Sequence, residues 1–155
     1  MNMTKVKAIS ENKNYKAIDI GPLDQLSKYE FLHPKTGTLV KGRLFIGEIL
    51  HTTGAEVSFR ELPPKTAIPF LHKHHKHEEI YIFLKGKGRF QVDDDVFEIQ
   101  EGSIVKVSLD GNRIFSNNSE TPMIYMVIQS HADTLAGYNV SDGYRVEGEI
   151  KLNRV

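Results

Sequence analysis

The residues best suited to chemistry in this sequence lie in one short segment, residues 70–81. Four of the seven histidines fall within six positions there, and two acidic residues follow directly. If the chain around them is extended, His72 and His74 point to the same face, because side chains alternate along a strand. A turn over residues 75–78 would then bring Glu79 back toward the same space. Two imidazole nitrogens and one carboxylate are therefore expected to converge.

A set of two histidines and one carboxylate leaves open coordination positions and suits divalent iron, manganese, nickel or zinc. The chain has no cysteine, so thiolate ligands, thiol nucleophiles and disulfides are excluded. The alternative interpretation is a solvated, histidine-rich turn without a metal. His75 and His77 fall in the expected turn and are assigned mainly to the surface, and His131 has no partner that the sequence identifies.

The elements that must position this segment read as short strands. From Gly42 onward, apolar or alternating runs are separated by turn residues, which is typical of a β-sandwich or barrel. Residues 80–84 and 123–128 are apolar at every position, so these two strands need cover on both faces. Either an N-terminal arm or a second subunit is expected to provide that cover.

The length of 155 residues indicates one all-β domain with flanking segments. Residues 1–41 are interpreted as an N-terminal arm, with a short strand at residues 15–20. Residues 42–131 are interpreted as the barrel. Residues 132–155 are expected to form a C-terminal tail that packs on it.

The spacing within the histidine segment resembles the first motif of the cupin family. The match consists of His72-x-His74, four further residues, Glu79, six further residues and Gly86. A second, weaker match begins at Gly102, and together the two cover roughly residues 55–130. The resemblance implies a double-stranded β-helix, the jelly-roll barrel of cupins, with a metal held by the two histidines and the glutamate.

The sequence departs from the cupin pattern at several positions. Thr66 replaces the first glycine of the first motif, and Ser108 and Asp110 replace a proline and a glycine of the second. The second motif normally supplies a further histidine ligand four residues before an asparagine. Asn117 is present, but the histidine position holds Arg113.

Arg113 cannot coordinate a cation, because its guanidinium stays protonated. In one interpretation, a three-ligand metal site persists and Arg113 binds an anionic part of the substrate. In another, Arg113 pairs with Glu79, takes the place of the metal, and the pocket is a binding site. A third places Arg113 on a surface loop after the turn at residues 110–112.

The remaining candidate ligand-binding residues follow from position. Asn117 is expected beside Arg113 on the wall opposite the metal ligands. Tyr81 and Phe83 share a face with Glu79 and are expected to form the pocket wall, where Tyr81 could also donate a hydrogen bond to a ligand.

Two functions are therefore carried forward. The first is a metal-dependent cupin acting on a small polar or anionic molecule, such as a sugar or keto acid, by isomerase or dioxygenase chemistry. The second is a non-catalytic module that binds or senses a small molecule and lacks full metal competence. Because two strands need cover and cupins commonly pair through their sheets, a homodimer is expected under either.

The charge balance disfavours polyanionic partners. Lysine plus arginine equals aspartate plus glutamate at 20 each, so no overall field favours nucleic acid or an anionic membrane. No run of about 18 apolar residues could span a bilayer, and the N-terminus carries no signal-peptide pattern. A cytoplasmic location is expected.

Overall fold

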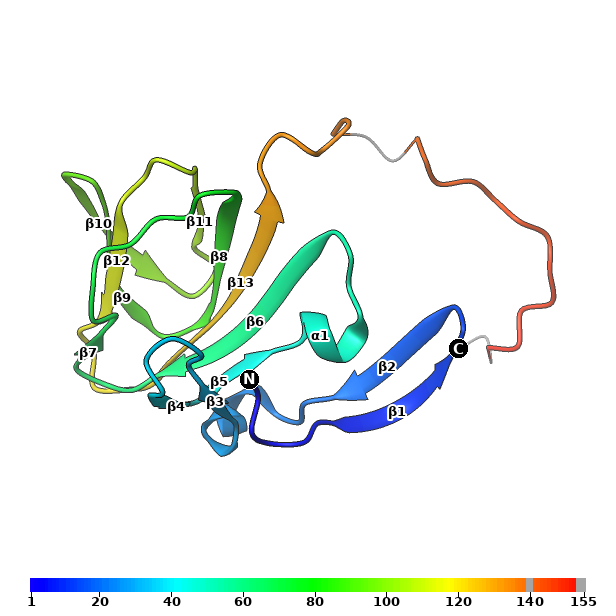
Figure 1. Cartoon of the computed structure of the whole chain (residues 1–155), viewed down its shortest axis with the longest axis horizontal. Helices are drawn as coiled ribbons and strands as arrows, with labels where there is room; N and C mark the ends of the chain where they lie inside the picture. The colour runs from blue at the N-terminus through cyan, green and yellow to red at the C-terminus, as the bar shows by residue number, and fades with distance from the viewer. Residues whose placement is uncertain (139–140, 153–155) are drawn as a thin grey trace.

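The computed structural model describes residues 1–138 and 141–152, and β-strands dominate them (Figure 1). Before the barrel come β1 (Lys7–Asn12), β2 (Tyr15–Asp19), the 3-10 helix η1 (Leu23–Lys28), β3 (Glu30–Leu32) and β4 (Leu39–Lys41). The barrel region contains β5 (Arg43–Phe45), α1 (Gly47–Leu50), β6 (Ala55–Leu62), β7 (Thr66–Ala67), β8 (His77–Lys85), β9 (Lys87–Val92), β10 (Asp95–Gln100), β11 (Ile104–Val107), β12 (Arg113–Asn117) and β13 (Met123–His131).

Two facing antiparallel sheets form the barrel. One has the strand order β11-β8-β13-β6-β5, and the other has the order β10-β9-β12-β7. The side chains of β8 alternate as the sequence requires, with Glu79, Tyr81 and Phe83 buried and the residues between them less so. The predicted all-β barrel is confirmed.

The turn between β8 and β9 depends on one glycine. Gly86 has a φ of +89°, which side chains with a Cβ atom rarely adopt. A Cβ atom there would also lie 3.0 Å from the carbonyl oxygen of Pro122. The glycine of the first motif therefore lets the chain pass from β8 in one sheet to β9 in the other, close to the start of β13.

Aromatic rings fill the space between the two sheets. The Phe90 and Phe115 rings stack with centroids 5.2 Å apart, and the Tyr125 ring meets Phe115 edge-on at 5.0 Å. Phe83 joins the same cluster at 1% exposure. Such pairs contribute about 0.5–1.5 kcal/mol each beyond the burial of their area. This part of the barrel is a packed core, so a ligand site has to lie beyond it.

A second apolar cluster covers part of the outer face of the five-stranded sheet. Leu26 from η1 and Tyr29 pack there against Leu44 and Ile124, with Leu84 of β8 at the margin. Ile124 and Leu84 belong to the two strands that are apolar on both faces. For Ile124 and Leu84, the N-terminal arm supplies the cover that the sequence requires.

The flanking segments leave the barrel in different ways. The β1-β2 hairpin projects from it, and the described residues after β13 run away from it with exposed side chains, among them Tyr138 at 101% (Figure 1). Packing of this tail on the barrel, like the proposed boundaries at residues 41 and 131, therefore stays a prediction.

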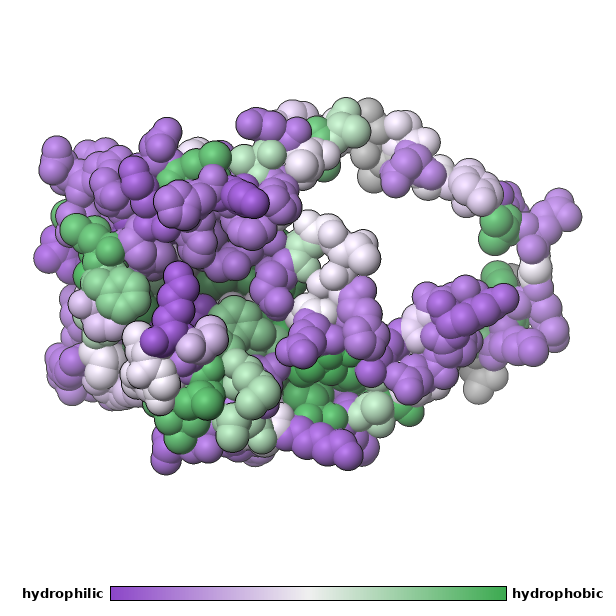
Figure 2. All heavy atoms as spheres, in the orientation of Figure 1, coloured by the Kyte–Doolittle hydropathy of each residue, from purple (hydrophilic) through white to green (hydrophobic). Residues whose placement is uncertain are grey.

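In the view of Figure 2, hydrophilic residues cover the upper barrel surface, and hydrophobic residues gather lower down. No helix among the described residues is long and apolar enough to cross a membrane.

The packing of the arm can be tested at Leu26, which is fully buried in the second cluster. Leu26→Ala removes apolar contacts and leaves a cavity, so we expect the free energy of unfolding to fall by about 2–5 kcal/mol. Leu23→Ala is the matched control, because Leu23 is 37% exposed on the same helix. Its cost should stay within about 0.5 kcal/mol. Urea unfolding followed by circular dichroism measures both, and equal small losses would contradict the packing.

Candidate metal centre

His72, His74 and Glu79 come together at one point of the barrel. One ligand atom from each lies within 4.8 Å of the others. His72 forms an isolated backbone bridge with Arg113, the first residue of β12, and Glu79 is the third residue of β8. The structure thus places side by side the three residues that the sequence selected.

The carboxylate of Glu79 is surrounded by donors. Its Oε2 accepts hydrogen bonds from the Tyr81 hydroxyl and from Arg113, whose Nε lies at 3.0 Å and Nη2 at 2.7 Å. Its Oε1 accepts a 2.7 Å hydrogen bond from Gln129 Nε2. His74 Nε2 lies 3.2 Å from the same oxygen. A buried carboxylate is tolerated only with such compensation.

The same contacts set the protonation states. Burial by itself would raise the pKa of the Glu79 carboxyl, but His74, Tyr81 and Arg113 together hold that pKa well below its usual range. Burial and the Glu79 charge raise the pKa of the Tyr81 hydroxyl, which therefore stays a donor. Burial lowers the pKa of His72 despite the opposing effect of Glu79. The centre therefore combines an ionised carboxylate with a neutral His72 imidazole at neutral pH.

Arg113 is completely buried, so its placement on a surface loop is wrong. Its Nε and Nη2 bind Glu79, and its Nη1 donates to the carbonyl oxygen of Gly111 at 3.0 Å. The structure thus contains the pairing of Arg113 with Glu79 that one interpretation of the sequence expected. These bonds use three of its five N–H donors, and the side chain has no exposed surface at which a substrate anion could reach the others.

The three donors fit a divalent metal ion. Two imidazoles and one carboxylate are ligands that iron, manganese, nickel and zinc accept, and both histidines must then be neutral. The Arg113 guanidinium binds Oε2, whereas Oε1 is the oxygen beside His74. Arg113 occupies the position that the cupin resemblance assigns to a fourth ligand. The protein therefore offers three ligands and not four.

The neighbouring histidines have different surroundings. The chain bends at residues 75–76, and β8 already begins at His77, so the expected turn over residues 75–78 is too long. His75 is exposed there. The His77 ring lies against His131, with ring centroids 4.5 Å apart. His131 thus has the partner that the sequence could not identify, because β8 and β13 pair through these two residues.

Of the four residues predicted to bind substrate, Arg113 and Tyr81 lie at the cluster, and Phe83 lies in the aromatic core. Asn117 is fully buried. Its amide nitrogen donates to the carbonyl oxygen of Leu62, at the end of β6, and to that of Thr121, in the loop between β12 and β13. Each of the four has partners within the protein. Their contact with a ligand stays a prediction.

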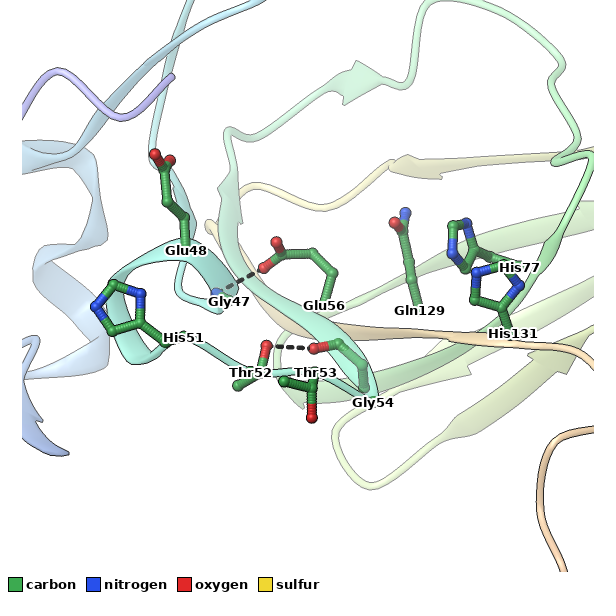
Figure 3. A pocket seen from close by; sticks show the side chains of 11 residues that line it. Gly47, Glu48, His51, Thr52, Thr53, Gly54, Glu56, His77, Gln129 and His131 are labelled. Carbon is green, nitrogen blue, oxygen red and sulfur yellow. Dashed lines mark hydrogen bonds between the residues drawn. The ribbon is translucent and has the colours of Figure 1, made fainter. Parts of the chain in front are cut away.

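Gln129 is a site residue that the sequence interpretation missed. It is the polar residue that ends the apolar run of β13, and the register places it directly opposite Glu79. Gln129 also lines a cavity of about 600 Å³, together with Glu56, His77 and His131 (Figure 3). Gln129 therefore contacts both the three-ligand cluster, through Glu79, and the cavity. The polar end of the apolar run was the available signal.

Comparisons with known proteins agree with this geometry. Residues 58–129 match the family model described as "Cupin domain". A cupin protein of Bacteroides fragilis, BF4112, is 38% identical in a match that covers 68% of this chain and 89% of that one, with a TM-score of 0.64. The uncharacterized protein MJ1618 of Methanocaldococcus jannaschii is 29% identical over 62% of this chain and 83% of its own length.

A more distant solved structure shares the fold alone. It is a putative sugar phosphate isomerase from Acidithiobacillus ferrooxidans, with 22% identity, 59% of each chain covered and a TM-score of 0.53.

The buried pair of Glu79 and Arg113 can be tested with a double-mutant cycle. Arg113→Met leaves a buried carboxylate without its charge partner, so we expect a loss of about 3–5 kcal/mol in the free energy of unfolding. Glu79→Met combined with Arg113→Met removes both charges and should recover most of that loss. Chemical denaturation of the metal-free protein measures both single variants, Arg113→Met and Glu79→Met, and the double variant. Additive losses from the two single substitutions would show that the pair is not coupled.

Proposed function

The chain belongs to the cupin superfamily, and from that premise we propose that it binds one divalent metal ion and acts on a small polar or anionic molecule. His72, His74 and Glu79 would hold the metal. The observation that carries the proposal is the convergence of one ligand atom from each residue within 4.8 Å, with a carboxyl whose pKa is held low. Three ligands leave coordination positions open.

The proposed chemistry is of the isomerase or dioxygenase type. When bound, the metal supplies Lewis acidity, which suits isomerisation of a sugar or keto acid, or open iron positions, which suit oxygenation. The name of the Acidithiobacillus structure is compatible with the first, although at 22% identity that likeness carries the fold alone. The reaction is therefore proposed from the donor set of this chain.

The protein's own residues would keep Glu79 ready for this role. Arg113 and Tyr81 both bind Oε2 and so fix the plane of the carboxylate. Gln129 binds Oε1 from the cavity side. These contacts orient the ligand oxygen before a metal arrives, which is the function of residues behind the ligands in metal sites.

The second candidate is a metal-free binding module, and one observation favours it. Both oxygens of Glu79 already have partners within the protein, and Arg113 neutralises the charge that would attract a cation. In this case the cavity beside Gln129 binds its ligand without chemistry.

Metal content separates the two candidates. We expect about one equivalent of iron, manganese, nickel or zinc in protein purified without a histidine tag or chelator, and its loss in His74→Ala. His75→Ala is the matched control, because His75 is exposed in the adjacent bend. Plasma mass spectrometry of the three proteins gives the answer. Absence of metal in the parent protein, even after reconstitution, would favour the binding module.

We also propose that the chain forms a homodimer through the outer face of its five-stranded sheet. The arm covers Ile124 closely, whereas the outward residues Ile82 and Met126 are only half-buried and Ile104 is 67% exposed. Burial of this remaining apolar surface would favour association. Sedimentation equilibrium should give twice the chain mass of 17.6 kDa. A monomer at micromolar concentration would refute the dimer.

A further inference from the structure

Two arginines lie side by side on the inner face of the barrel without an acidic partner. Arg43 of β5 and Arg60 of β6 are directly opposite in the strand register, and Arg60 is opposite Tyr125 of the aromatic core. Leu44 packs on the other face, in the cluster beneath the arm. Because successive side chains alternate, both arginines face the same interior as Tyr125.

Both side chains are half-buried, and one nitrogen of each guanidinium group has no partner among the described residues. The Nε atoms of Arg43 and Arg60 are both buried and have no hydrogen-bond partner. No ion pair within 4.0 Å joins either one to a carboxylate among residues 1–138 and 141–152. Arg113, by contrast, is paired with Glu79. The contact of Arg43 with the Phe45 ring, 4.6 Å from its centroid, provides stacking and no negative charge.

This arrangement is costly for the empty protein. Like charges directly opposite on neighbouring strands repel each other, and buried donors without acceptors lose their hydration. Burial lowers the pKa of Arg43, Tyr125 opposes that effect, and Arg60 lowers the pKa further. An anion bound between the two arginines would accept hydrogen bonds from them and offset this repulsion.

We propose that Arg43 and Arg60 together bind an anionic oxygen group, a carboxylate or a phosphate, of the small molecule on which the protein acts. Planar guanidinium groups bind such anions with paired, charge-assisted hydrogen bonds. The assignment of the anion to the substrate rests on the proposed function, whereas the anion site itself rests on the two arginines alone. It replaces Arg113, whose fork is already occupied by Glu79, as the anchor for an anionic substrate.

The strand register places this anion site on the same sheet face as the candidate metal centre. Arg60 is four residues from Glu56 on β6, and Glu56 is opposite Gln129, which is opposite Glu79. At about 3.3 Å per residue, the level of Arg60 and the level of Glu56 are about 13 Å apart along the strand. Long arginine side chains shorten that gap, and the Glu79 charge acts on Arg43. A small molecule anchored at the arginines is therefore held near the three-ligand cluster.

The test uses inorganic phosphate and malonate as probes on the full chain after metal removal by a chelator. Calorimetric titration should detect binding of at least one probe. The probe that binds with the higher affinity shows whether the natural group is a phosphate or a carboxylate. Arg60→Gln and Arg43→Gln should each weaken that binding about tenfold or more. Arg89→Gln, a control at an arginine paired with Glu98 on the surface, should bind as the parent does. Unchanged affinity in Arg60→Gln, or no binding to the parent chain, would overturn the proposal.

A second variant at the same position distinguishes loss of anion binding from loss of folding. Arg60→Met keeps an unbranched apolar stem and removes the repulsion, so its melting temperature without anion should equal or exceed that of the parent. The rise in melting temperature that phosphate or malonate causes should disappear in this variant. A melting temperature well below that of the parent in anion-free buffer would identify Arg60 as a structural residue and overturn the proposal.

Metal content of the same samples separates this proposal from the proposed function. Arg60→Gln should retain the metal content of the parent, because Arg60 is not a ligand. Anion binding by a protein that never takes up metal would refute the metal-dependent function and leave the anion site standing. Metal uptake without anion binding would refute the anion site and leave the metal-dependent function standing.

Discussion

The carboxylate of Glu79, buried inside the barrel, is the constraint on which the rest of the site depends. A buried charge without partners would cost several kcal/mol, so the surrounding strands must supply donors. Tyr81 comes from the same strand, Arg113 from the facing sheet and Gln129 from the neighbouring strand. The pair of Glu79 and Arg113 thus connects the two sheets at the point where the aromatic core ends.

Arg113 has a second structural effect through its backbone. It exchanges two backbone hydrogen bonds with His72, at 3.2 and 3.0 Å. The residue that neutralises Glu79 therefore also holds the backbone of the first histidine against β12. The position of His72 relative to Glu79 depends on this contact, because no regular strand extends through residues 69–76. The arginine side chain removes one potential ligand and binds Glu79, while the backbone of the same residue holds His72.

The arginines of the barrel interior divide into two kinds. Arg113 is paired with Glu79 and belongs to the scaffold, whereas neither Arg43 nor Arg60 forms an ion pair with a carboxylate of the described residues. Uncompensated charge lowers the stability of the empty protein, and proteins retain such local conflicts chiefly where function requires them. Uncompensated positive charge on the same sheet face as a three-ligand cluster is consistent with a site that an anionic molecule completes.

The sequence by itself determined the β-rich barrel region and the grouping of His72, His74 and Glu79. These three residues lie within eight positions, and the alternation of side chains along extended chain is enough to direct them to one place. Only the tertiary structure decided the partners of Glu79, since Arg113 is 34 residues away and Gln129 is 50 residues away. It also placed Arg43 beside Arg60. Pairings of this kind depend on the register between distant strands, and a shift of one residue would turn each side chain to the opposite face.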